Sequence, residues 1–479
     1  MSAQLSDRRD GYVDLRSYAA IGNGRTVALI ARDGSVDWFP VPDLDSAPVF
    51  ARLLDAGHGG CIELQPDPQA LAAAGVDVAA DLQVHREYVA GTNVLRTTCT
   101  TPVGTVRVTD SLNMGSTGAL PWTELARCVD GVEGQVPMAW RVRPGTMLNG
   151  ASPWVQHTGQ GPVVRVGGVS LAVRSEQAGA HDAGPQTISG RFTTGEGTAH
   201  LLAVVGTAAE PLRLPEPKAI RRNVGLSVDL WRRWTDLLEY DGPYPEEVRR
   251  SALVLKMLGH SPSGSIAAAA TTSLPENREG TKNYDYRFAW IRDATYALHA
   301  LLRLGEQEDV HAAVSWLLRL AREQSPRLHV LNRLNGELPE TGTAELDVPG
   351  WRGIGPVVSG NDALDRAITL ADGGHLPGTD DRWRDERDRV RAWIDEHGWS
   401  EERGAYIMYR GGDQLDASVL LHTISGFDTG PRMSATIDAL REELGRGPLL
   451  YRYSGMPAEE GAFTACGFWC VAALTLNGQ

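Results

Sequence analysis

The sequence has few cysteines, no Cys-x-x-Cys pair and no histidine pair with zinc-ligand spacing. Its five cysteines are odd in number and scattered along the chain: Cys61, Cys99, Cys128, Cys466 and Cys470. This pattern argues against a disulfide framework and against a structural zinc site. Gly-rich phosphate loops and nucleophile elbows are also absent. We therefore expect a reducing compartment, no metal and no cofactor.

Long apolar runs and clustered positive charges are missing as well. The start, Met1 to Asp10, contains Arg8 and Arg9 but no apolar stretch after them, so it does not have the pattern of a signal peptide. No later segment is apolar for long enough to span a bilayer. We expect a cytoplasmic protein. A formal net charge of -14 without a basic stripe disfavours nucleic acid and membranes as partners. A small-molecule substrate remains the expected partner.

Short strands are predicted for the first two hundred residues. Residues 26–32 and 35–39 are apolar-rich and flank Asp33-Gly34, a pair suited to a tight hairpin turn. Apolar residues also alternate on both sides of Gly167-Gly168, which predicts a second hairpin with one buried face. Many short strands separated by turn signals predict an antiparallel β-sandwich.

A proline-rich stretch at residues 211–217 ends this pattern, and the apolar spacing then changes from two to about 3.6. The later part is therefore predicted to be nearly all helical. Three apolar helix faces are predicted: Val248, Ala252 and Leu255; Ala294, Ala297, Leu298, Leu301 and Leu302; and Val310, Ala313, Val314, Leu317 and Leu318.

Charged and aromatic residues are concentrated at positions 283–293, which read Asn-Tyr-Asp-Tyr-Arg-Phe-Ala-Trp-Ile-Arg-Asp just ahead of an apolar helix. Rings can cover the apolar faces of a sugar while charged groups bond its hydroxyls. A buried ion-pair network that fixes the helix start would have the same composition, and the composition alone does not separate the two. The candidate binding residues are Tyr284, Asp285, Arg287, Trp290, Arg292 and Asp293.

This stretch resembles the Asn-Trp-Asp-Tyr-Arg-x-x-Trp-x-Arg-Asp signature of glycoside hydrolase family 15, the bacterial glucoamylase/trehalase-like proteins. Other parts of the chain also resemble the family: residues 21–25, 33–38, 91–95, 266–276 and 459–463. The resemblance implies an N-terminal β-sandwich followed by an (α/α)6 barrel. It also implies inverting hydrolysis of α-glucosides such as maltooligosaccharides or trehalose.

The same resemblance implies roles for individual residues. Arg292 and Asp293 would hold the sugar in the innermost subsite, and Glu460 would be the general base that activates water. Trp351 and Arg352 are further candidates for substrate binding. Asp285 and Arg287 are more readily explained as structural than as catalytic residues.

The chain departs from the family where the general acid is expected. An inverting glycosidase needs a carboxylic acid roughly 6.5–9.5 Å from the base. Family members place several helices, including a Trp-Glu motif that supplies this acid, between a Gly-Asn like Gly360-Asn361 and a segment like residues 363–367. Here Asp362 alone separates the two landmarks. Glu340 best matches a family carboxylate that could replace the acid, although a solvated loop residue is the favoured interpretation of it.

The chain also stops soon after Trp469, where relatives continue. We therefore expect a sandwich at 1–210, a linker with a helix at 211–245, and an incomplete (α/α)6-type barrel at 246–479, shortened near 361–364 and at the C-terminus. A gap in the barrel would expose apolar helix faces that must be covered. A homodimer that covers them is a reasonable hypothesis.

Three functions remain open at this point. In the first, the pocket is repurposed, and Glu460, Asp293 and Glu340 carry out acid/base chemistry such as cyclisation, dehydration or bond cleavage on a small polar or polyhydroxylated metabolite. In the second, the chain is an α-glucoside hydrolase whose general acid has been replaced. In the third, it is a catalytically dead sugar-binding protein. The first is the preferred hypothesis, because one placed carboxylate is typically worth about 10² to 10⁴ in rate, too little for unaided glycoside hydrolysis.

Overall fold

The structure is a computed structural model that describes residues 8–116, 118–208, 211–277, 279–280, 283–324, 329, 331–339, 344–359, 380–424, 426–456 and 461–478. Two of the predicted catalytic residues, Glu340 and Glu460, lie outside the described residues. The chain forms two compact units. The first consists of Met1–Pro275, Asn283–Gln324 and His329–Leu370, and the second of Glu276–Lys282, Ser325–Leu328 and Ala371–Gln479.

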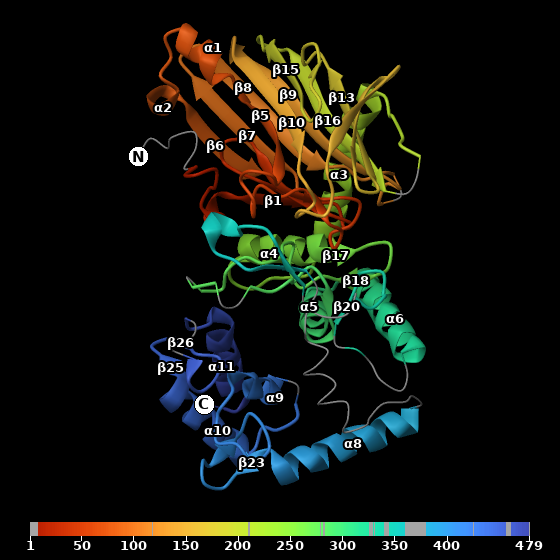
Figure 1. Cartoon of the computed structure of the whole chain (residues 1–479). Coiled ribbons are helices and arrows are strands. Elements are labelled where there is room, and N and C mark those ends of the chain that lie inside the picture. Colours follow the sequence, from red (N-terminus) through yellow and green to blue (C-terminus); the bar gives the residue numbers. More distant parts are fainter. Residues whose placement is uncertain are drawn as a thin grey trace. The chain divides into compact units, whose positions relative to one another are not determined.

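The N-terminal part of the first unit is built from two antiparallel sheets, seen in red to yellow in Figure 1. One sheet contains β1 (Ala19–Gly22), β2 (Val27–Ile30), β3 (Val36–Pro40), β4 (Pro48–Phe50), β5 (Gly60–Pro66), β10 (Pro137–Pro144), β14 (Asp182–Ala183) and β15 (Ile188–Thr193). The other contains β6 (Gln83–Tyr88), β7 (Leu95–Thr101), β8 (Gly104–Leu112), β9 (Thr123–Gly134), β11 (Trp154–Thr158), β12 (Gly161–Val166), β13 (Val169–Glu176) and β16 (Ala199–Ala208). One apolar core lies between them and includes residues of both sheets, among them Phe39, Trp140 and Val204.

Both predicted hairpins are confirmed. β2 pairs with β3 across a turn in which Gly34 adopts φ +81°. β12 pairs with β13 across Gly167, at φ +53°. Glycine occupies such left-handed conformations without the penalty that a Cβ would bring, so these two positions fix the turns. Two short helices, α1 (Pro68–Ala73) and α2 (Val78–Asp81), and a 3₁₀ turn at Leu15–Ser17 complete this part.

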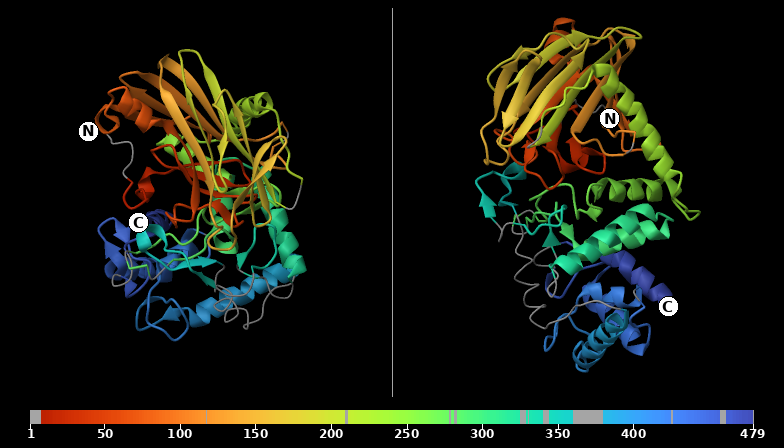
Figure 2. Two further views of the ribbon diagram at one scale, coloured as in Figure 1. Left: turned by 45° about the horizontal axis from the view of Figure 1, so that its top comes forward. Right: turned by 90° about the vertical axis from the view of Figure 1, so that its right-hand side faces the viewer.

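A long helix, α3 (Pro217–Thr235), follows the last strand and packs on the second sheet. Its Ile220 and Val224 bury the sheet residues Ala126, Leu201 and Val205. Figure 2 shows α3 running beside the sheet in its right-hand view. The outer face of this sheet is therefore covered by the same helix that leads into the helical part.

The helical part of the first unit contains α4 (Pro245–Leu258), α5 (Ile291–Arg303) and α6 (Glu308–Glu323). Short two-stranded ladders lie between these helices or follow them: β17 (Gly259–His260) with β18 (Ser265–Ile266), β19 (Ala289–Trp290) with β20 (Leu331–Asn332), and β21 (Ala344–Leu346) with β22 (Val357–Ser359). A 3₁₀ turn, η2 (Trp351–Gly353), joins the last two strands. A sandwich of antiparallel sheets followed by helices agrees with the coarse prediction.

The predicted apolar helix faces are correct only in part. Ala294, Ala297, Leu298 and Leu301 of α5 and Val310 and Ala313 of α6 are buried, as expected. The prediction was wrong for Leu302, Val314 and Leu318, whose side chains are exposed. Helical spacing identifies an apolar stripe, but a residue at its edge is buried only where a neighbouring element covers it.

The second unit has its own core. It contains α8 (Asp380–His397), η3 (Ala417–Leu420), α9 (Leu421–Ile424), α10 (Pro431–Leu444) and α11 (Thr464–Leu476), with the ladders β23 (Trp399–Ser400)/β24 (Ala405–Tyr406) and β25 (Gly445–Arg446)/β26 (Leu449–Leu450). Cys466 and Cys470 of α11 pack in this core with Leu440. Burial raises the pKa of Cys466 to about 11. All five cysteines are free thiols in buried positions, so they pack as small apolar residues.

No helix in the described part of the chain combines the length and the apolarity needed to cross a bilayer. The domain limits predicted from the sequence remain predictions. The last sheet strand ends at Ala208, and the first long helix begins at Pro217.

Candidate functional site

The first turn of α5 presents Arg292 and Asp293 to solvent. Arg292 Nη2 lies 3.1 Å from both carboxylate oxygens of Asp293, and the two side chains are 57% and 35% exposed. A carboxylate in the first turn is favoured by the helix dipole, which helps to hold Asp293 in place. The pair therefore offers charged donors and acceptors that a sugar could reach.

Two aromatic residues lie next to this pair. Trp290 directly precedes α5, and the Arg292 guanidinium lies 5.8 Å from the centroid of its ring. Tyr296, on the same helix, has a raised pKa, first through burial; the charge of Arg292 lowers this pKa and that of Asp293 raises it. Tyr296 was not among the binding residues predicted from the sequence, although its position four residues after Arg292 places both side chains on one helix face.

Asp285 and Arg287 lie in a different environment from Arg292 and Asp293. Their side chains are 0% and 4% exposed, and Arg287 donates from Nε and Nη2 to the two carboxylate oxygens of Asp285 at 2.9 and 2.7 Å. Burial alone would lower the pKa of Arg287, but the charge and hydrogen bonds of Asp285 raise it above its ordinary value. Arg287 also donates to the carbonyl oxygen of Ser46, in a loop of the sandwich, at 2.6 Å. This pair fastens the segment before α5 to the sandwich.

The remaining predicted binding residues have separate contacts. The Trp351 indole donates to the Val13 carbonyl oxygen at 3.0 Å, and the Arg352 guanidinium lies 4.5 Å from the Trp351 ring centroid. Tyr284 is exposed, and its ring meets that of Tyr286 edge to face at 5.9 Å. The described contacts thus bring together Trp290, Arg292, Asp293 and Tyr296. They give Trp351 a contact with the N-terminal segment instead.

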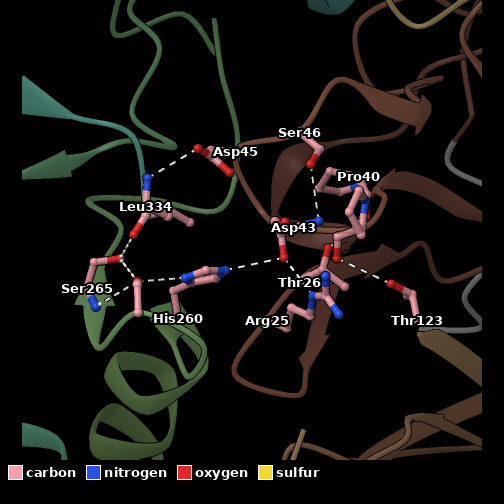
Figure 3. Close-up of polar contacts among 12 residues, drawn as sticks. Arg25, Thr26, Pro40, Asp43, Asp45, Ser46, Thr123, His260, Ser265 and Leu334 are labelled. Atoms are coloured by element: carbon pink, nitrogen blue, oxygen red, sulfur yellow. Dashed lines mark hydrogen bonds and ion pairs between the residues drawn. The ribbon is translucent and has the colours of Figure 1, made fainter. Parts of the chain in front are cut away.

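The loop after β3 connects the sandwich to the helical part through several polar contacts, which Figure 3 shows. Asp43 accepts from Arg25 Nε at 2.6 Å and lies 3.3 Å from His260 Nε2. The other ring nitrogen of His260 lies 2.7 Å from Ser263 Oγ. Two residues further along the loop, Asp45 accepts from the Leu334 backbone N–H at 3.2 Å. The loop therefore holds the segments after α4 and after β20.

Asp43 should make stability depend on pH. Burial alone would raise the pKa of its carboxyl group, but the hydrogen bonds from His260 and Arg25, with the charges of both, outweigh burial and lower the pKa. A lowered folded-state pKa gives stability that is present above the unfolded value, about 3.9, and is lost as pH falls through the folded value. We expect Asp43→Asn to lower the free energy of unfolding at pH 7, and the difference from the wild type to shrink in acid.

Urea unfolding of both proteins at neutral and at acidic pH would measure this difference. Asp182→Asn, at an exposed position on β14, is the matched control and should have little effect at either pH. A difference for Asp43→Asn that stays constant across the pH range would contradict the assignment.

A metal centre is not evident among the described residues: no group of three or more His, Cys, Asp or Glu side chains there could hold an ion. Glu340 and Glu460, the predicted acid and base, are not among these residues. Their roles therefore remain predictions.

The similarity to known proteins extends along nearly the whole chain. The sequence profile of glycosyl hydrolases family 15 matches residues 242–366 and 361–479, and that of the trehalase-like N-terminal domain matches residues 12–177. The trehalase of Mycobacterium tuberculosis is 27% identical over 587 aligned positions, which cover 99% of this chain and 83% of the relative. Trehalases of Mycolicibacterium smegmatis and Thermoplasma volcanium are 26% and 24% identical, with 98% of this chain covered and 84% and 85% of theirs.

Antiparallel sheets followed by helices, together with these matches, define a glycoside-hydrolase-like enzyme. The chain belongs to glycosyl hydrolases family 15 and carries a trehalase-like N-terminal domain. The two matches to the family profile meet at residues 361–366, where the two sequence landmarks are fused. The 587 aligned positions exceed the 479 residues of this chain by more than a hundred, so that many positions of the relative have no counterpart here.

Proposed function

We propose that this enzyme hydrolyses an α-glucoside of the trehalose type. The observation that carries the proposal is the similarity to proteins named trehalase over 98–99% of the chain, through the sandwich as well as the helices. This favours hydrolysis over the repurposed chemistry preferred from the sequence. The helices would form an incomplete (α/α)6-type barrel, and a homodimer that covers its gap stays a prediction.

In the proposed mechanism, Arg292 and Asp293 bond the hydroxyls of the innermost glucose unit, and Trp290 covers one of its apolar faces. Their shared position at the start of α5 supports this role, because Arg292 and Asp293 lie in its first turn and Trp290 directly precedes it. Glu460 would take a proton from the attacking water. A second carboxylic acid would protonate the leaving oxygen, and Glu340 is the candidate for it.

One observation favours a second candidate function. More than a hundred positions of the Mycobacterium tuberculosis trehalase have no counterpart here, and the family profile divides at residues 361–366. If the lost stretch held the general acid, the remaining carboxylates would suit proton transfer in a more facile reaction, such as a cyclisation or dehydration of a polyhydroxylated metabolite.

Glucose release from trehalose, maltose and isomaltose by the purified full chain would test the proposal. We expect release from trehalose by the wild type. Asp293→Asn, which keeps the shape of the side chain but removes its charge, should reduce release at least about tenfold, because hydrogen bonds to charged groups are worth about 1.5–3 kcal/mol. Asp388→Asn, at an exposed position on α8, is the control.

Each alternative predicts a different result of this experiment. Binding of trehalose without release of glucose would identify a sugar-binding protein and overturn hydrolysis. Neither binding nor release of any of the three sugars would favour the repurposed enzyme, and polyhydroxylated metabolites without a glycosidic bond would then be tested.

A further inference from the structure

A pocket lies in the first unit, away from the first turn of α5. Its volume is about 680 Å³, within the usual range for small-ligand sites. It is lined by the C-terminal part of α3, the ends of α4 and α5, the start of α6, and the sandwich loops around Gly24 and Ser116. Leu301 lines it nine residues after Arg292, about 13 Å along the helix axis. The pocket is therefore distinct from the candidate catalytic site.

One side of this pocket is apolar and partly aromatic. The apolar lining includes Trp231, Trp234, Leu237, Leu255, Ile266 and Leu301. The rings of Trp231 and Trp234 meet edge to face, with their centroids 6.5 Å apart. Leu237 is 65% exposed. Such a surface can cover the apolar face of a ring while leaving one edge of that ring free to make hydrogen bonds.

Hydrogen-bonding groups of both kinds face the same pocket. Lys256 Nζ lies 2.6 Å from Asp309 Oδ2 and 5.7 Å from the centroid of the Trp234 ring. Lysine has three N–H donors, of which the Asp309 carboxylate takes two. Glu308 also lines the pocket, and its side chain has no hydrogen-bond or ion-pair partner among the described residues. A ligand could therefore both donate to carboxylates and accept from an ammonium group.

The charges of the lining suggest which ligands fit. Arg233 and Lys256 are matched in number by Glu308 and Asp309, so the pocket favours neither a strong anion nor a strong cation.

We propose that this pocket is a second, non-catalytic binding site for a neutral sugar, a mono- or disaccharide. Its apolar face would lie against Trp234 and its hydroxyls against Lys256 and Asp309. The inference does not depend on turnover at Arg292 and Asp293.

The test uses the full chain carrying Asp293→Asn, so that the candidate catalytic site is weakened. Binding of trehalose and of maltose is measured by titration calorimetry. We expect binding to persist in this background and to fall at least about tenfold when Asp309→Asn is added, because charged hydrogen bonds to the sugar are lost.

A blocking variant avoids removing the Lys256–Asp309 pair. Ala312 is exposed on α6 and lines the pocket, so Ala312→Trp should fill it and weaken binding to a similar degree. His311→Trp places the same side chain on the adjacent exposed position, which does not line the pocket, and should leave binding unchanged. In an otherwise wild-type chain, Ala312→Trp should leave glucose release from trehalose intact.

Two results would overturn the proposal. One is sugar binding that Ala312→Trp and His311→Trp affect equally, or that neither affects. The other is the absence of any sugar binding once Asp293→Asn is present, which would leave a single site at the start of α5. If the wild-type chain binds sugar but releases no glucose, the proposed hydrolysis is contradicted. The proposal for this pocket is not affected by that result.

Discussion

Glu460→Gln is expected to lower kcat for glucose release from trehalose by about 10² to 10⁴, the usual contribution of a placed general base. The amide has nearly the shape of the carboxylate but cannot take a proton from the attacking water. KM should change much less than kcat, because the base acts on water and not on the bound sugar. Steady-state kinetics on the full chain would measure both quantities.

Glu459→Gln is the matched control for this variant, since it changes the neighbouring carboxylate in the same way. It should retain nearly full turnover. Equal losses in the two variants would argue that the segment responds to a change of charge and that Glu460 has no special role. Full activity of Glu460→Gln would exclude it as the base.

Arg287→Met is expected to lower the free energy of unfolding by about 3–5 kcal/mol, because it leaves the carboxylate of Asp285 buried without its partner. The variant also loses the hydrogen bond to the Ser46 carbonyl oxygen and the contact of the guanidinium with Trp38, 5.9 Å from the ring centroid. Urea unfolding followed by tryptophan fluorescence would measure the change.

Two further variants separate the buried pair from a general effect of removing arginine. Arg292→Met removes the 57% exposed guanidinium and should cost less than about 1 kcal/mol. The double variant Arg287→Met/Asp285→Leu should recover part of the loss, since no unpaired charge is then buried. Equal effects of Arg287→Met and Arg292→Met would show that burial of the first pair does not matter for stability.

These two pairs also show how far the sequence can predict the site. Asp285 and Arg287 are separated by one residue and Arg292 and Asp293 are adjacent, and the same aromatic residues surround both pairs in sequence. What distinguishes them is the loop at Ser46, about 240 positions earlier, which receives the hydrogen bond from Arg287. Local composition predicts that charges gather here, but it cannot tell which of them the sandwich will bury.

The hairpins were predictable because their signal is local. Gly34 and Gly167 each meet a backbone requirement that the adjacent strands impose. The helices were also predictable from apolar spacing, yet the exposure of Leu302, Val314 and Leu318 was not, since it depends on which elements pack beside α5 and α6. The pocket lined by α3, α4, α5 and α6 gave no sequence signal, because its walls come from segments as distant as Gly24 and Ala312.

The loop after β3 has a consequence for how this protein can tolerate insertions and deletions. Within four residues, Asp43, Asp45 and Ser46 bind His260, Leu334 and Arg287, which belong to three separate segments of the helical part. Surface loops usually accept changes in length. Here one added residue would shift all three attachments at once, so the length of this loop should be among the most restricted features of the chain.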